Sequence, residues 1–196
     1  MKPIYILFTL LILATSCGNS ETKHQQTSPD KVYTDYIISA KTLQPNLENG
    51  EPFGNLDYDK IIAYDFAGSE EPYPTVIDRE GKFVPVISKQ QYLTQEQADK
   101  ILSALSSKTT YGEATAACFH PHFALVFYKG NRMLHQINVC LNCNYLITDI
   151  AIPAETHKKV NEGTDTEYAL NGFTESGKKA ITDLCKELNF TYGTEK

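Results

Sequence analysis

The sequence has no cluster of basic side chains. It contains 18 lysine and arginine residues against 24 aspartate and glutamate residues, which gives a formal net charge of −6. Proteins that bind DNA or RNA group lysine and arginine on one surface, because these side chains displace the counterions around the phosphates. We therefore expect no nucleic-acid partner.

Motifs of the common catalytic sites are also absent from the sequence. There is no glycine-rich phosphate loop, no Gly-x-Ser-x-Gly turn around a nucleophile and no His-Glu-x-x-His metal motif. No histidine directly follows Cys143, so the Cys-x-x-Cys stretch at 140–143 is not a haem-attachment motif. No catalytic base can be identified, and the sequence favours a protein that is not an enzyme.

The apolar run at the start of the chain is too short to span a membrane. It covers residues 4–14, whereas a helix needs roughly 20 apolar residues to cross a bilayer. Lys2 precedes the run, and the small residues Thr15 and Ser16 separate it from Cys17. This layout is typical of a secretory signal.

The stretch MKPIYILFTLLILATSC resembles the signal of bacterial lipoproteins, whose lipobox ends in a cysteine that becomes the lipid-modified first residue of the mature protein. Ala14, Ser16 and Cys17 carry this resemblance. It implies that Cys17 is lipidated and that the protein is anchored to a membrane of the cell envelope, outside the cytoplasm. The alternative is a plain secretory signal that is cleaved near Ser16 and leaves Cys17 unmodified.

This interpretation divides the chain into three parts. Residues 1–16 are the expected signal peptide, and residues 17–31 the expected flexible tether, because residues 18–30 are polar and have no apolar period. Residues 32–196 are long enough for one globular domain. Within it, the prolines and glycines up to residue 56 predict loop with at most one short element.

The apolar pattern of the domain predicts an α+β fold with an antiparallel sheet. Strands are expected at 60–66 and 145–152. Residues 74–87 are expected to form two more strands, joined by a turn at Glu80-Gly81. A capping box at Thr94 and Gln97 predicts a helix over about 94–107, and Thr174 begins a second over about 174–188. Both helices are expected to pack on the sheet around a long central hairpin.

The hairpin lies within the stretch CFHPHFALVFYKGNRMLHQINVCLNC, residues 118–143. A two-residue loop at Gly130-Asn131 would place Cys118 opposite Cys143. A three-residue loop would shift the register and bury one continuous apolar face, which we favour. That face would consist of Phe123, Leu125, Phe127, Met133, Ile137, Val139 and Leu141.

Under the favoured register, four possible metal ligands project together from the opposite face. They are Cys118, His120, His122 and Cys140, and a bulge near Asn142 could bring Cys143 back to join them. Thiolates and imidazoles suit tetrahedral zinc. A disulfide of Cys118 with Cys140 or Cys143 is an equal alternative, and thiol redox exchange is a third. Cys185 lies in the apolar stripe of the second helix and is expected to be core.

The hairpin also resembles that of small bacterial lipoproteins with a Cys-Phe-x-Pro stretch, an aromatic strand and a closing Cys-x-x-Cys. The matching residues are Cys118, Phe119, Pro121, Cys140 and Cys143. The resemblance implies a shared site but no known activity.

Three hypotheses for function remain from the sequence. The first is a lipid-anchored envelope protein whose cysteines and histidines bind a structural or sensory metal such as zinc. The second is an extracytoplasmic thiol-disulfide or metal-dependent enzyme, and the third is a binding module held together by a disulfide. The sequence identifies no protein or small-molecule partner.

Overall fold

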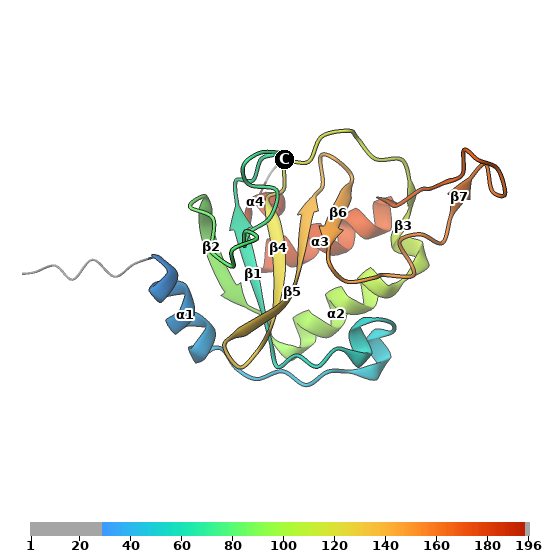
Figure 1. Ribbon diagram of the computed structural model, residues 1–196. Coiled ribbons are helices and arrows are strands. Elements are labelled where there is room, and N and C mark those ends of the chain that lie inside the picture. Colours follow the sequence, from blue (N-terminus) through green and yellow to red (C-terminus); the bar gives the residue numbers. More distant parts are fainter. Residues whose placement is uncertain (1–28, 195–196) are drawn as a thin grey trace, which may run out of the picture.

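The computed structural model describes residues 29–194, which contain a five-stranded antiparallel sheet (Figure 1). The strand order is β2-β1-β4-β5-β6. The predicted α+β class with an antiparallel sheet is confirmed. The strands are β1 (Lys60–Phe66), β2 (Ile87–Tyr92), β4 (Phe123–Lys129), β5 (Arg132–Cys140) and β6 (Tyr145–Thr148).

Two helices cover one face of the sheet, as predicted. They are α2 (Gln95–Ser106) and α3 (Glu175–Glu187) (Figure 1). The Thr94 side chain caps α2 in a complete capping box with Gln97, and Thr174 caps α3. Their apolar stripes bury Leu102 and Cys185 in the core that this face of the sheet shares with both helices. The expectation that Cys185 belongs to the core is confirmed.

The other face of the sheet is covered by α1 (Pro29–Ser39) and by residues 73–87. More elements form before residue 56 than the one short element expected: helix α1 and the two 3-10 helices η1 (Leu47–Asn49) and η2 (Phe53–Asn55). Helix α1 begins within the stretch that we expected to be the tether. Because both faces are covered, all seven residues of the interior strand β1 are buried.

The two strands expected at 74–87 do not form. The segment contains one isolated bridge, between Ile77 and Phe83, and regular pairing begins only at β2. The segment crosses the face of the sheet, so its backbone pairs with side chains of β5. The Val76 amide donates to Asn138 Oδ1 at 2.9 Å, and the Ile77 amide to Gln136 Oε1 at 3.3 Å.

The β4–β5 hairpin combines the two registers that the sequence left open. Lys129 pairs with Arg132, which leaves Gly130 and Asn131 as a two-residue loop. A bulge between Phe127 and Tyr128 then shifts the pairing, so that Phe123 lies opposite Val139. The predicted apolar face is therefore buried against α2 and α3. Met133 is the exception, because it precedes the bulge and packs on the other face.

No helix among residues 29–194 is long and apolar enough to cross a membrane.

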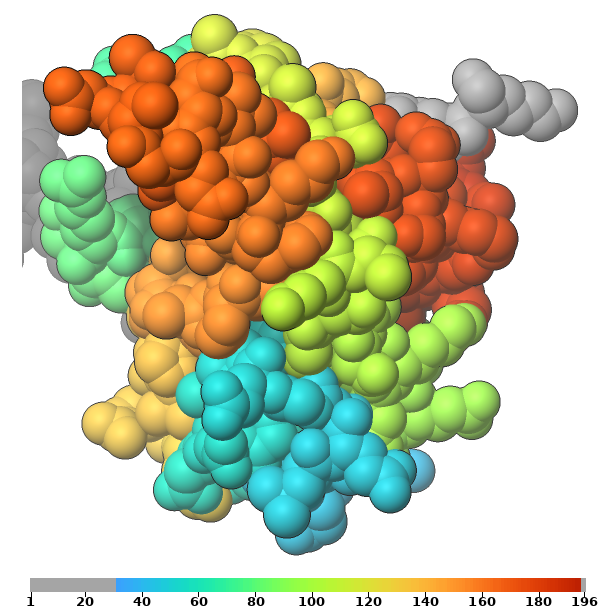
Figure 2. Space-filling view, turned by 90° about the vertical axis from the view of Figure 1, so that its right-hand side faces the viewer, coloured from blue at the N-terminus to red at the C-terminus, as the bar shows by residue number. Residues whose placement is uncertain are grey.

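Shorter elements complete the described chain. In the space-filling view, the orange segment around β7 and β8 lies at the surface beside the yellow-green segment around β3 (Figure 2). The shorter elements are η1 (Leu47–Asn49), η2 (Phe53–Asn55), η3 (Lys108–Thr110), β3 (Tyr111–Glu113), β7 (Lys159–Val160), β8 (Tyr168–Ala169), β9 (Gly172–Phe173) and α4 (Thr191–Thr194).

Candidate functional site

A disulfide joins the end of β5 to the turn that follows it. Cys140 is the last residue of β5, and its sulfur is bonded to Cys143 at 1.98 Å. The turn at residues 141–144 ends at Asn144, which adopts a left-handed conformation (φ 67°) that asparagine tolerates better than most residues. This turn, rather than the expected bulge near Asn142, brings Cys143 back to Cys140, and the disulfide joins these two cysteines instead of Cys118 with either of them. Both cysteines are buried.

The free thiol of Cys118 lies beside this disulfide. The segment 114–122 runs next to the turn, where the Ala116 amide donates to the Cys143 carbonyl at 2.8 Å. Phe119 is buried and packs on Tyr145, with ring centroids 4.9 Å apart. These contacts place Cys118 Sγ 3.8 Å from Cys143 Sγ. Cys118 is exposed, so it is the part of the cluster that solvent can reach.

Backbone amides point at both sulfurs of the disulfide. The His120 amide donates to Cys143 Sγ at 3.2 Å, and the Cys143 amide donates to Cys140 Sγ at 3.0 Å. Hydrogen bonds of this kind stabilise the charged form of a thiol more than the neutral form. Either sulfur would therefore be stabilised as a thiolate if the disulfide opened.

The two histidines predicted for this site are placed differently from the cysteines. The His122 ring faces away to the end of β1, with Nδ1 3.1 Å from the Phe66 carbonyl oxygen, and its ring packs edge-on against Tyr192. His120 is exposed and contacts the cluster through its backbone amide. Within residues 29–194, no three histidine, cysteine or acidic side chains are grouped so as to hold a metal ion. The structure thus brings together Cys118, Cys140 and Cys143 but not the imidazoles.

One further cysteine of the described residues, Cys185, lies apart from this cluster. Cys185 is buried in α3, and burial raises the pKa of its thiol well above the ordinary value, which keeps it protonated and unreactive. Cys17, the expected lipidation site, lies outside the described residues.

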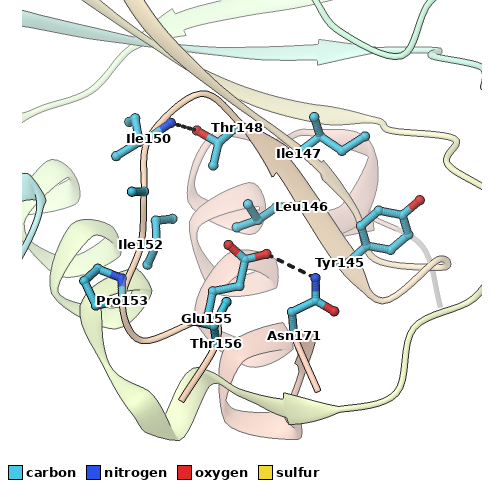
Figure 3. A pocket seen from close by; sticks show the side chains of 11 residues that line it. Tyr145, Leu146, Ile147, Thr148, Ile150, Ile152, Pro153, Glu155, Thr156 and Asn171 are labelled. Atoms are coloured by element: carbon cyan, nitrogen blue, oxygen red, sulfur yellow. Dashed lines mark hydrogen bonds between the residues drawn. The ribbon is translucent and has the colours of Figure 1, made fainter. Parts of the chain in front are cut away.

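A second feature was not predicted from the sequence. A cavity of about 540 Å³ lies along β6, and Glu155 points into it (Figure 3). Burial raises the pKa of the Glu155 carboxyl to about 7, and a hydrogen bond from Asn171 opposes this shift only in part. The one signal in the sequence was a carboxylate directly after the apolar residues 150–154.

Comparisons with known proteins found no relative: no protein-family model, no curated protein and no solved structure matches the chain.

Proposed function

We propose that this chain is a lipid-anchored protein of the bacterial cell envelope that exchanges disulfides with a thiol-bearing partner through Cys118, Cys140 and Cys143. One observation carries the proposal: an exposed free thiol lies 3.8 Å from a sulfur of a buried disulfide. A disulfide that only staples the turn needs no third sulfur at this distance.

The internal step is a thiol–disulfide exchange. The Cys118 thiolate attacks Cys143 Sγ and forms a Cys118–Cys143 bond, while the Cys140–Cys143 bond breaks. The electron pair of the broken bond stays on Cys140 Sγ, which takes up a proton to replace the one that Cys118 released. The Cys143 amide already donates to Cys140 Sγ, so the leaving thiolate is stabilised where it forms.

The internal step moves the disulfide to the surface. A partner thiolate can then attack Cys118 Sγ, which forms a mixed disulfide and releases Cys143 as a thiolate. A second partner thiolate attacks the partner sulfur of the mixed disulfide, which forms the partner's disulfide and releases Cys118 as a thiolate that regains its proton. Two partner thiols thereby become one disulfide, and Cys140 and Cys143 keep the two electrons and two protons as thiols.

The proposed location agrees with this chemistry. A lipidated Cys17 would hold the domain outside the cytoplasm, where disulfides persist because the reducing systems of the cytosol are absent. The partner class is therefore a thiol-bearing protein or small molecule of the envelope.

The test is the rate at which dithiothreitol reduces the Cys140–Cys143 disulfide. We expect Cys118→Ser to slow reduction about tenfold or more, since the reductant must then reach a buried bond without the exposed relay. The matched control Cys185→Ser, which removes the buried thiol of α3, should leave the rate near that of the wild type. Equal rates for the wild type and Cys118→Ser would overturn the proposal.

A trapping experiment tests the same step without added reductant. In Cys140→Ser, Cys118 carries the only cysteine sulfur among residues 29–194 that lies within reach of Cys143, so we expect a Cys118–Cys143 disulfide in the oxidised protein. Peptide mapping by mass spectrometry detects this bond. Two free thiols in the folded, air-oxidised variant would argue that the cluster is an inert staple.

Zinc binding is the second candidate, favoured by one distance. Sulfur atoms 3.8 Å apart, as in Cys118 and Cys143, have the separation of two ligands on a tetrahedral zinc ion. The ion would require Cys140 and Cys143 to be reduced, and the exposed His120 side chain would have to turn toward the cluster to supply the fourth ligand, because the His122 ring contacts the Phe66 carbonyl. Titration of the reduced protein with zinc, followed by thiol counting, distinguishes the candidates: bound zinc with protected thiols favours the metal, and reoxidation to a disulfide favours exchange.

A further inference from the structure

The sheet ends at β6, and a groove follows its outer edge. Among residues 29–194, β5 is the only strand that pairs with β6. All four residues of β6 line the cavity of about 540 Å³, although alternate side chains of a strand point to opposite faces. A cavity that touches every residue of the strand must run along its edge, where backbone groups can accept another strand.

The floor and far wall of the groove are apolar. Leu146 and Ile152 point into it from its two sides, with Ile150 and Pro153 beside them (Figure 3). A free strand edge beside an apolar pocket is the combination that binds an added strand. The backbone of the edge supplies hydrogen bonds, and the pocket receives a side chain of the added strand.

Glu155 gives the groove its charge. Asn171 Nδ2 donates to Glu155 Oε1 at 3.5 Å, which is a long hydrogen bond. In the part of the chain that the structure describes, no lysine, arginine or histidine lines the cavity. A half-buried carboxylate without a cation nearby is costly when ionised. A ligand that brings a positive charge would remove that cost.

We propose that this groove binds an extended peptide segment of another protein, which pairs with β6 and places a lysine or arginine side chain against Glu155. The free edge selects an extended backbone, the apolar lining accepts the stem of the side chain, and the carboxylate selects its charged end. A small amine could use the carboxylate but not the edge. The site is independent of the cysteine cluster and of the proposed disulfide exchange.

The test uses an acetylated, amidated hexapeptide of alternating threonine and valine with one central lysine. Two control peptides differ at single features: one has glutamine in place of lysine, and the other has methyl groups on alternate backbone nitrogens. The protein variants are Glu155→Gln and, as a matched control, Glu162→Gln, whose side chain is exposed and does not line the groove.

We expect the lysine peptide to shift the amide resonances of Leu146, Ile147 and Thr148. Its affinity should fall about tenfold for Glu155→Gln, and equally for the glutamine peptide, as expected for the loss of one charge-assisted hydrogen bond. Glu162→Gln should bind like the wild type, and the N-methylated peptide should not bind.

Several results would overturn the proposal. Equal affinity of the lysine peptide for the wild type and for Glu155→Gln would show that the Glu155 carboxylate does not contribute to binding. Binding of the N-methylated peptide would exclude strand pairing. Absence of binding at millimolar peptide would exclude the ligand class. Dimerisation of the protein through β6 would assign the edge to a second copy of this chain.

Discussion

The Asn138 side chain replaces a strand partner for the segment that crosses the sheet. It is fully buried, and its Oδ1 accepts the Val76 amide at 2.9 Å. The neighbours of Asn138 in β5, Ile137 and Val139, are apolar. A polar side chain stands between them because the Val76 amide of another segment needs an acceptor there. Gln136 makes the equivalent contact nearer to solvent, with the Ile77 amide.

Removal of this acceptor should destabilise the protein. We expect Asn138→Ala to lower the free energy of unfolding by about 1–3 kcal/mol, because it leaves the Val76 amide buried without a partner. Gln136→Ala is the matched comparison and should cost less, since its site is only partly buried. Urea denaturation measures both, and equal small losses would show that water satisfies the Val76 amide.

Glu155 should make stability depend on pH. Its pKa is raised to about 7 in the folded protein from an ordinary value of 4.5. Its neighbours Tyr111 on β3 and Tyr145 on β6 have raised pKa values and stay neutral in this range, and exposed His157 turns its Nδ1 to the Ala154 carbonyl. The folded state therefore holds a proton at Glu155 that the unfolded state has already lost between about pH 4.5 and 7.

The stabilising contribution is complete below about pH 4.5, falls as the pH rises and is lost above about 7, by about 1–3 kcal/mol in all. We expect Glu155→Gln to remove this part of the pH dependence, so that the variant gains stability relative to the wild type between pH 5 and pH 8. Urea denaturation at pH 5 and at pH 8 measures the free energy of unfolding of both proteins. An equal change in this free energy for the wild type and Glu155→Gln would contradict the prediction.

At the scale of elements, the helices were predictable because their signals are local. Thr94 with Gln97 fixes the start of α2, and Thr174 fixes that of α3. Residues 74–87 have an equally strong strand pattern, but only a single bridge and the backbone hydrogen bonds beside it join the two halves of this segment. Here the segment lies across a sheet face, and its partners Gln136 and Asn138 are about sixty residues away in sequence, so no local pattern could reveal them.

The hairpin register shows a similar limit. The burial of Phe123 with Val139 was predictable from the apolar alternation, and the two-residue loop from Gly130-Asn131. The two signals disagree by one residue, and the bulge after Phe127 reconciles them. In the sequence alone the two signals are alternatives, because a bulge satisfies both only when its position is known.

The faces of α2 give a direct test at this scale. We expect Leu102→Asp to unfold the domain or cost several kcal/mol, because Leu102 is fully buried against the sheet and an aspartate there would have no partner. Lys108→Asp changes an exposed residue just after the helix and should cost little. Thermal melting compares the two, and equal melting temperatures would contradict the assignment of the buried face.

At the scale of the whole molecule, the sequence predicted where the cysteine cluster would be but not how it is bonded. The hairpin places Cys118 near Cys140 and Cys143 whichever chemistry applies. The bond between Cys140 and Cys143 depends on the left-handed Asn144, and the distance of Cys118 depends on the packing of Phe119 against Tyr145. Glu155 could not be predicted, since its burial depends on β6 and Asn171 meeting across the fold.

Attachment to a membrane concerns the whole chain in the cell. The resemblance to lipoprotein signals implies a diacylglycerol on the Cys17 thiol, and serine offers no thiol for that bond. We therefore expect Cys17→Ser to lose incorporated radioactive palmitate and to move from the membrane fraction to the soluble fraction when expressed in a bacterium.

Cys118→Ser is the matched control, since it removes a cysteine from the domain and leaves the signal intact. Its label and its membrane fraction should stay at the wild-type level. An unchanged amount of Cys17→Ser in the membrane fraction, after cleavage of the signal, would refute the lipid anchor and leave a plain secretory signal as the explanation of the first residues.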